Sequence, residues 1–190
     1  GLAENDYYKI LSDKEGINKI LHSYIRPKKR VAYFSYLKRL LRHKYYVFYA
    51  CCKLGIPWRG VTHNLSAFRP SEFKAFAGYF FGSKSYPNSA QFRYAWLRHV
   101  RRNEHHWQYW VLPSMKGDEP VNHQAMWFPV SVLKEMVADW WASYKVYPDA
   151  KHPLEYYKEN RSRIAMHNIM KDMLNHKLEK YIRRIEGEKK

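Results

Sequence analysis

The segment VAYFSYLKRLLRHKYYVFYACCKLG, residues 31–55, predicts a long helix around which the rest of the chain can pack. Its apolar side chains recur at the three- and four-residue intervals of one helix face, and Gly55 is a natural stop. The residues that we assign to this face are Leu37, Leu40, Leu41, Phe48, Cys51 and Leu54. His43 falls at the edge of the face, so we expect an imidazole close to the protein interior.

The remaining sequence is also mostly helical in pattern. Ser12 and Glu15 form a capping box, and Pro70 and Pro129 suit the first turns of later helices. Helices are expected at residues 12–26, 31–54, 70–81, 89–102, 129–144 and from 154 past 181. Two short segments, 109–112 and 124–128, flank the turn-rich KGDEP and admit a small β-hairpin within residues 109–128. The expected fold is therefore an all-α helical bundle with one small hairpin.

The same patterns divide the chain into three parts. Residues 1–30 are expected to form an N-terminal helix and the basic connector RPKKR. Residues 31–150 are expected to form the helical core. Residues 151–190 are expected to form a C-terminal helix that packs on this core and ends in the charged tail RRIEGEKK.

Charge and cysteine content restrict the partners and the compartment. The formal net charge of +17 favours anionic partners such as nucleotides, phosphorylated small molecules or nucleic acid, although a merely basic protein is the plain alternative. Two adjacent cysteines, Cys51 and Cys52, exclude a disulfide framework and predict buried thiols. We find no signal-peptide pattern and no apolar run long enough to span a membrane. A cytoplasmic protein without a membrane partner is expected, and its oligomeric state is left open.

A set of histidines and one aspartate recurs on or beside the predicted helices. Its members are His43, His63, His99, His105 or His106, and Asp139. Neutral imidazoles and a carboxylate are the usual ligands of transition metals in proteins. Each of these residues, taken alone, is more often a hydrogen-bonded core or surface residue, and their spacing forms no compact motif such as HExxH. Their order along successive helices is therefore the stronger signal.

Three blocks carry a resemblance that uses this order. They are LLRHKYYVFYACCKLGIPWRGVTHNLSAFRPSEF, WLRHVRRNEHHWQYWVLP and EMVADWW. The chain resembles the HD superfamily of metal-dependent phosphohydrolases, and within it a small, uncharacterised bacterial and phage family. The resemblance covers residues 31–144 and part of the last helix. It implies an HD-like helical bundle that holds one or two divalent transition metals (Mn, Fe, Zn, Ni or Co).

The resemblance also implies a role for each residue of the set. His43 matches the first metal ligand, His63 matches the histidine of the His-Asp pair, and Asp139 matches the closing aspartate. His99 and one of His105 and His106, of which we favour His106, match the histidines of a second metal. We assign phosphate binding to three cations next to these ligands, which are Lys44, Arg101 and Arg102. Exposed helix charges are the alternative for each.

Two residues depart from the family pattern at its catalytic positions. Asn64 stands where the family has the metal-binding aspartate, and Ala67 stands where a lysine commonly follows. An amide offers a neutral oxygen in place of a carboxylate, so metal binding should weaken. Three interpretations stay open: an engineered knock-out, a natural pseudoenzyme that keeps the pocket for binding, or an enzyme of altered activity in which Asn64 still ligates.

The expected activity is metal-dependent hydrolysis of a nucleotide or another phosphate ester. This copy of the enzyme is inactive if Asn64 and Ala67 abolish catalysis. One alternative is a di-iron oxygenase, because some relatives with this ligand order activate oxygen. Another is a non-catalytic protein that binds nucleotides or nucleic acid, with the aromatics of HHWQYWVL and AMWFPV stacking on bases. The competing interpretation of those aromatics is that they are hydrophobic core residues.

Overall fold

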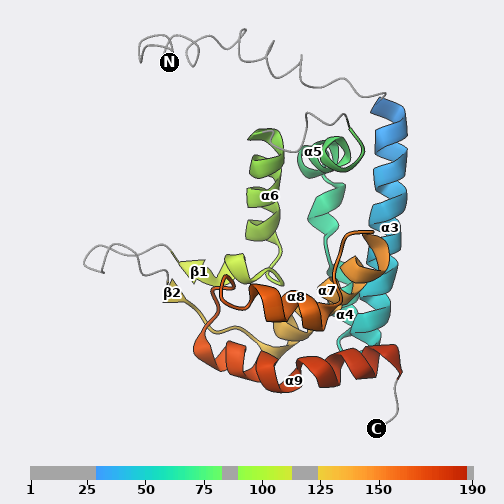
Figure 1. Cartoon of the computed structure of the whole chain (residues 1–190). Coiled ribbons are helices and arrows are strands. Elements are labelled where there is room, and N and C mark those ends of the chain that lie inside the picture. The colour runs from blue at the N-terminus through green and yellow to red at the C-terminus, as the bar shows by residue number, and fades with distance from the viewer. Residues whose placement is uncertain (1–28, 83–89, 113–123, 188–190) are drawn as a thin grey trace, which may run out of the picture.

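A computed structural model describes residues 29–82, 90–112 and 124–187, and it confirms the all-α fold class. Figure 1 shows α3 upright along one side, with α5 and α6 beside its upper part and α8 and α9 crossing below. In chain order the elements are α3 (Lys29–Lys53), α4 (Pro57–Thr62), η1 (Leu65–Phe68), α5 (Pro70–Phe81), α6 (Ala90–Arg102), η2 (Trp107–Trp110), β1 (Val111–Leu112), β2 (Gln124–Ala125), α7 (Val130–Val146), α8 (Pro153–Asn160) and α9 (Asn168–Glu186).

Most predicted elements are present in the described part of the chain. The helices expected at 31–54, 70–81, 89–102 and 129–144 correspond to α3, α5, α6 and α7. The hairpin is also present, because Val111 pairs with Ala125 and Leu112 with Gln124 in antiparallel register. The helix and connector expected within residues 1–30 lie outside the described residues, apart from the first turn of α3. No described helix has the length and apolar character needed to cross a membrane.

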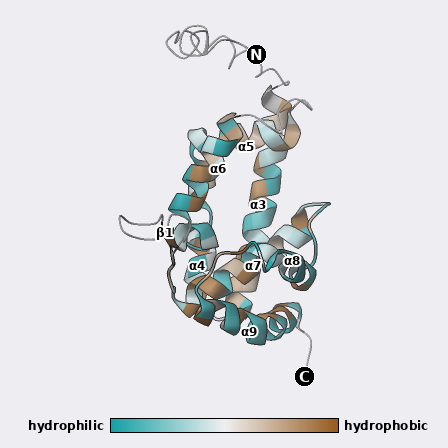
Figure 2. Cartoon of the chain, turned by 60° about the vertical axis from the view of Figure 1, so that its left-hand side comes forward, coloured by the Kyte–Doolittle hydropathy of each residue, from teal (hydrophilic) through white to brown (hydrophobic). Residues whose placement is uncertain are grey.

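The last helix differs from the sequence prediction, which expected one continuous helix. The structure has two, α8 and α9, separated by residues 161–167. Ile164 and Met166 in this connection are buried against the core, so the chain leaves the helical path to place them there. His167 then accepts a hydrogen bond from the backbone N–H of Ile169 and caps α9. In Figure 2, hydrophilic and hydrophobic residues alternate along α9, as expected for a helix with one buried face.

Two hydrophobic clusters fill the interior, and α3 contributes to both. The larger one joins α3, α7 and α9 and includes Val47 and Leu133, whereas the smaller one joins α3, α5 and α6 and includes Leu40 and Phe76. His43 lies on α3 between Leu40 and Val47 and is itself buried. A polar residue therefore occupies the junction of the two clusters.

The buried face of α3 is rotated from the predicted one. Leu40, Cys51 and Leu54 point inward as expected, but Leu37, Leu41 and Phe48 are exposed, and so is Cys52. The inward face is completed by Ala32, Tyr36, His43, Val47 and Ala50. Apolar and aromatic residues surround most of this helix, so periodicity alone could not select the face. His43 consequently lies in the middle of the buried face and not at its edge.

The short helix α4, which the sequence did not predict, packs tightly against α3. A side-chain carbon at Gly60 would lie 2.8 Å from the Cα of Phe48 and 2.9 Å from the Cβ of Cys51. Lys44 on α3 donates from its Nζ to the carbonyl oxygens of Val61 and His63, at 2.7 and 2.9 Å. These contacts fix the chain that leads into His63.

Gly60→Ala should therefore destabilise the protein by about 1–3 kcal/mol, because the added methyl group overpacks against the backbone of α3. The usual effect of this change inside a helix has the opposite sign, a gain of about 0.5–1 kcal/mol. Urea unfolding measures the difference, with Val61→Ala on the exposed face of α4 as the control. An unchanged or increased stability in Gly60→Ala would contradict the close packing of α4 on α3.

Candidate metal centre

Three side chains from three segments converge at the junction of the two clusters. His43 from α3 and His63 after α4 bring their Nε2 atoms within 3.4 Å of each other. The Oδ1 atom of Asp139 from α7 lies 3.0 Å from His43 Nε2 and 3.4 Å from His63 Nε2. Two imidazole nitrogens and a carboxylate oxygen thus form a small triangle inside the protein.

The triangle has the dimensions of a metal coordination shell. Ligand atoms that are each about 2.0–2.1 Å from a tetrahedral zinc ion lie about 3.3–3.4 Å from one another. A network of ion pairs is the alternative, with both imidazoles donating to Asp139. That alternative places two N–H groups against each other at the Nε2–Nε2 contact, whereas a cation between them would be attracted to both lone pairs. The donor set and its spacing fit a divalent transition metal.

Glu135, one helical turn before Asp139 on α7, orients two of the imidazoles. Its Oε1 atom lies 2.9 Å from His63 Nδ1 and 3.2 Å from His105 Nδ1. Its Oε2 atom accepts from Arg59 Nε at 2.6 Å, and Arg59 also donates to Glu104. A carboxylate that accepts the Nδ1 proton leaves Nε2 as the lone-pair atom, which is the usual arrangement behind metal-bound histidines.

A second group of imidazoles lies beside the first. His99, His105 and His106 bring one nitrogen each within 4.8 Å of the others. The Nε2 atoms of His105 and His106 are buried and have no hydrogen-bond partner among the described residues. Buried polar atoms are rarely left unpaired, so this pair suits a ligand that supplies the missing interaction. The prediction selected one of these two histidines, but the structure brings both to the centre.

Glu72 on α5 plays the same orienting role for His99. Its buried carboxylate lies 3.0 Å from His99 Nδ1 and accepts hydrogen bonds from Ser66 Oγ at 2.8 Å and Arg102 at 2.6 Å. Asn103 donates to the Ser66 hydroxyl at 2.8 Å and to the His99 carbonyl oxygen at 2.7 Å. Two buried carboxylates, each paired with an arginine, therefore orient the imidazoles, and Glu135 contacts members of both groups.

Burial keeps several of these imidazoles neutral. It lowers the pKa of His43, lowers that of His105 to about 4, and lowers that of His106 well below the usual value. Burial alone would raise the pKa of Asp139, but the adjacent imidazoles of His43 and His63 hold it well below its usual range. A neutral imidazole and an ionised carboxylate are the forms that bind metals.

Asn64 and Ala67 face a small cavity next to the centre. The cavity has a volume of about 220 Å³, and its wall includes His43, His99 and Asp139. Asn64 adopts a left-handed backbone conformation, with φ of 53°, which asparagine and aspartate tolerate better than most residues. Its Oδ1 atom is buried and has no partner among the described residues. Both catalytic positions of the resemblance thus lie where a ligand of the centre could reach them.

The three predicted phosphate-binding cations lie outside the small cavity, but Arg102 lines another cavity at the centre, of about 250 Å³, with His63 and His105. Lys44 donates to the carbonyls of Val61 and His63 at the end of α4, Arg102 is paired with Glu72, and Arg101 is exposed. None of them lines the small cavity or the larger one described below. Residues adjacent in a helix point in different directions, so proximity in sequence to His43 or His99 does not bring Lys44 or Arg101 into these cavities.

The sequence analysis missed the residues that support the imidazoles. These are Arg59, Ser66, Glu72, Asn103, Glu104 and Glu135. One signal was available, because Glu135 stands four residues before Asp139 and shares its helix face. Glu72 lies among apolar residues of α5, which would also have marked it as a buried carboxylate.

Glu135→Gln should reduce the affinity for a divalent metal about 10- to 100-fold, because a neutral amide orients His63 and His105 less strongly. Glu104→Gln is the matched control, since Glu104 accepts from the same arginine but contacts no imidazole. Isothermal titration with Zn²⁺ after treatment with a chelator measures both affinities. Equal affinities in the two variants would contradict the orienting role of Glu135.

Comparison with known proteins gives one match. Residues 32–184 match the model of a family of unknown function, DUF5662. Neither the curated proteins nor the solved structures contain a match. The matched region extends from α3 to α9 and contains every residue of the candidate centre. The chain therefore belongs to the DUF5662 family.

Proposed function

We propose that the chain is a metal-dependent hydrolase fold acting on a phosphate ester, with an active centre weakened by Asn64. The observation that carries the proposal is the buried triangle of His43 Nε2, His63 Nε2 and Asp139 Oδ1, at 3.0–3.4 Å, beside three further imidazoles. The order of these ligands along the chain is that of the HD superfamily, which the sequence resembles.

Two sets of residues would hold metal ions. His43, His63 and Asp139 would hold one, and His99, His105 and His106 would hold a second. When bound, such an ion supplies a Lewis acid that polarises a phosphoryl oxygen and lowers the pKa of a water ligand.

The protein residues supply orientation and a restricted environment. Glu135 and Glu72 keep the Nε2 atoms of His63 and His99 available, as their contacts with Nδ1 require. Burial raises the pKa of Tyr147, in the wall of the small cavity, to about 12, so its hydroxyl stays protonated and can donate to a substrate oxygen. Phe76 and Phe80 in the same wall exclude water from this side.

Asn64 and Ala67 account for a reduced activity. The Asn64 amide brings no negative charge to a position where a carboxylate would help to hold a cation. Ala67 lines the small cavity together with Asp139, so a lysine at this position would add a cation to the wall of that cavity. Loss of both groups weakens metal binding and removes a cation from the substrate side.

Asn64→Asp should lower the stability of the metal-free protein at neutral pH by about 1–3 kcal/mol, because it buries an unpaired charge. The same change should raise the affinity for a divalent metal at least about tenfold. Thermal unfolding with a chelator and with Zn²⁺ or Mn²⁺ measures both effects. Asn168→Asp, on the exposed start of α9, is the control for the change in charge.

The double variant Asn64→Asp with Ala67→Lys should gain hydrolysis of nucleotides or phosphomonoesters over the unsubstituted chain. The assay is phosphate release across a panel of esters and metals. Iron-dependent oxygen consumption by this variant would favour the di-iron oxygenase in its place. Salt-sensitive binding of single-stranded nucleic acid without metal or turnover would favour the non-catalytic alternative.

A further inference from the structure

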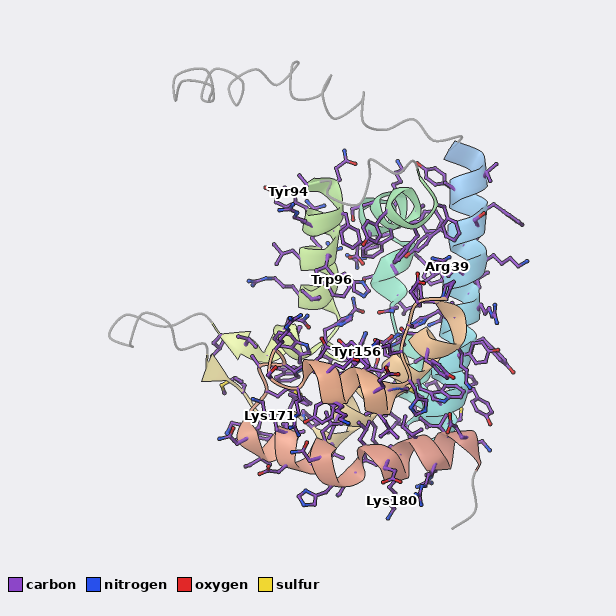
Figure 3. The ribbon with its side chains drawn as sticks, viewed as in Figure 1. Arg39, Tyr94, Trp96, Tyr156, Lys171 and Lys180 are labelled. Carbon is purple, nitrogen blue, oxygen red and sulfur yellow. The ribbon has the colours of Figure 1, made fainter. Side chains whose placement is uncertain are left out.

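A larger cavity opens on the centre from the side of α8. Its volume is about 480 Å³, within the range of small-molecule sites. Asp139, His105 and His106 form part of its wall, so a ligand in the cavity reaches both groups of imidazoles. Two further wall residues, Trp96 of α6 and Tyr156 of α8, are labelled in Figure 3.

Aromatic side chains make up much of the remaining wall. They are Trp96, Trp107, Trp140 and Tyr156. Trp140 contacts the ring of Tyr156 edge to face at 5.1 Å, and Trp96 stacks on His99 at 5.7 Å. Neighbouring rings thus hold these aromatics in place. Fixed aromatic faces suit a planar ring, because stacking requires little reordering of the wall.

The polar atoms of the wall include several acceptors. The Oε1 atom of Gln108 is buried and has no partner among the described residues. Asp149 and Glu159 add carboxylates, and the ammonium group of Lys151 is already bound by Glu155 and Glu159. This part of the cavity repels an anion and suits a neutral ring that carries an N–H donor.

We propose that the larger cavity is a base-binding subsite for a nucleotide whose base carries an exocyclic amino group. The ring stacks against the tryptophan and tyrosine wall, and the amino group donates to Gln108 Oε1. The position of the phosphate at the imidazole end rests on the proposed function. Binding of the base itself does not.

The test compares two nucleosides that differ only in this amino group, adenosine and purine riboside. Isothermal titration is performed on the full chain with chelator present, so that no metal contributes. Adenosine should bind about tenfold more tightly than purine riboside, because only adenosine satisfies the buried Gln108 oxygen. Absence of adenosine binding, or equal affinity for the two nucleosides, overturns the proposal.

Variants locate the site. Gln108→Leu should bring the affinity ratio close to one, and Trp140→Leu should weaken both nucleosides by about 5- to 100-fold. Trp58→Leu, on the exposed face of α4, should change neither affinity. A preference for adenosine that survives in Gln108→Leu overturns the assignment of that residue. If Trp140→Leu does not fold, the comparison of nucleosides and Gln108→Leu still decide the question.

The base-binding subsite and the hydrolase activity can be refuted independently of each other. A protein that binds Zn²⁺ through the imidazoles but no adenosine retains the hydrolase proposal and loses the base-binding subsite. A protein that binds adenosine but no metal loses the hydrolase proposal and keeps the subsite.

Discussion

The structure depends on keeping imidazoles buried between two hydrophobic clusters. A buried polar group is costly unless it is paired, and each of His63, His99 and His105 is paired through Nδ1 with a buried carboxylate. Those carboxylates are paired in turn with Arg59 and Arg102 at the protein surface. These hydrogen bonds therefore connect the arginines with the buried imidazoles, and the Nε2 atom of His63 lies 3.4 Å from that of His43. The close approach of these two nitrogen atoms is the reason to infer a cation.

Much of this arrangement could be predicted from the sequence. His43, His63, His99 and Asp139 were selected because they recur on successive helices, and the structure brings His43, His63 and Asp139 within hydrogen-bonding distance. Element bounds followed from proline, glycine and apolar spacing, as for α5 between Pro70 and Gly82. Patterns of this kind report on local structure and on the order of ligands.

Other features were decided by tertiary packing and could not be predicted. The inward face of α3 was chosen by contact with α5 and α7, since apolar residues also occur on its outer side. The sequence could mark Glu72 and Glu135 as buried carboxylates, but only the packed structure shows which imidazoles they contact. Lys44 was predicted to contact substrate because it follows His43 in the sequence. In the structure α4 lies close to α3, and Lys44 donates to two backbone carbonyls of that segment.

Metal coordination in solution tests the central claim most directly. X-ray absorption spectroscopy of the protein loaded with one equivalent of Zn²⁺ should show imidazole nitrogen and carboxylate oxygen ligands at about 2.0–2.2 Å. The spectrum should lose imidazole scattering in His63→Ala. Failure to bind Zn²⁺ stoichiometrically, or a shell of sulfur ligands at about 2.3 Å, would show that the buried imidazoles form no metal centre.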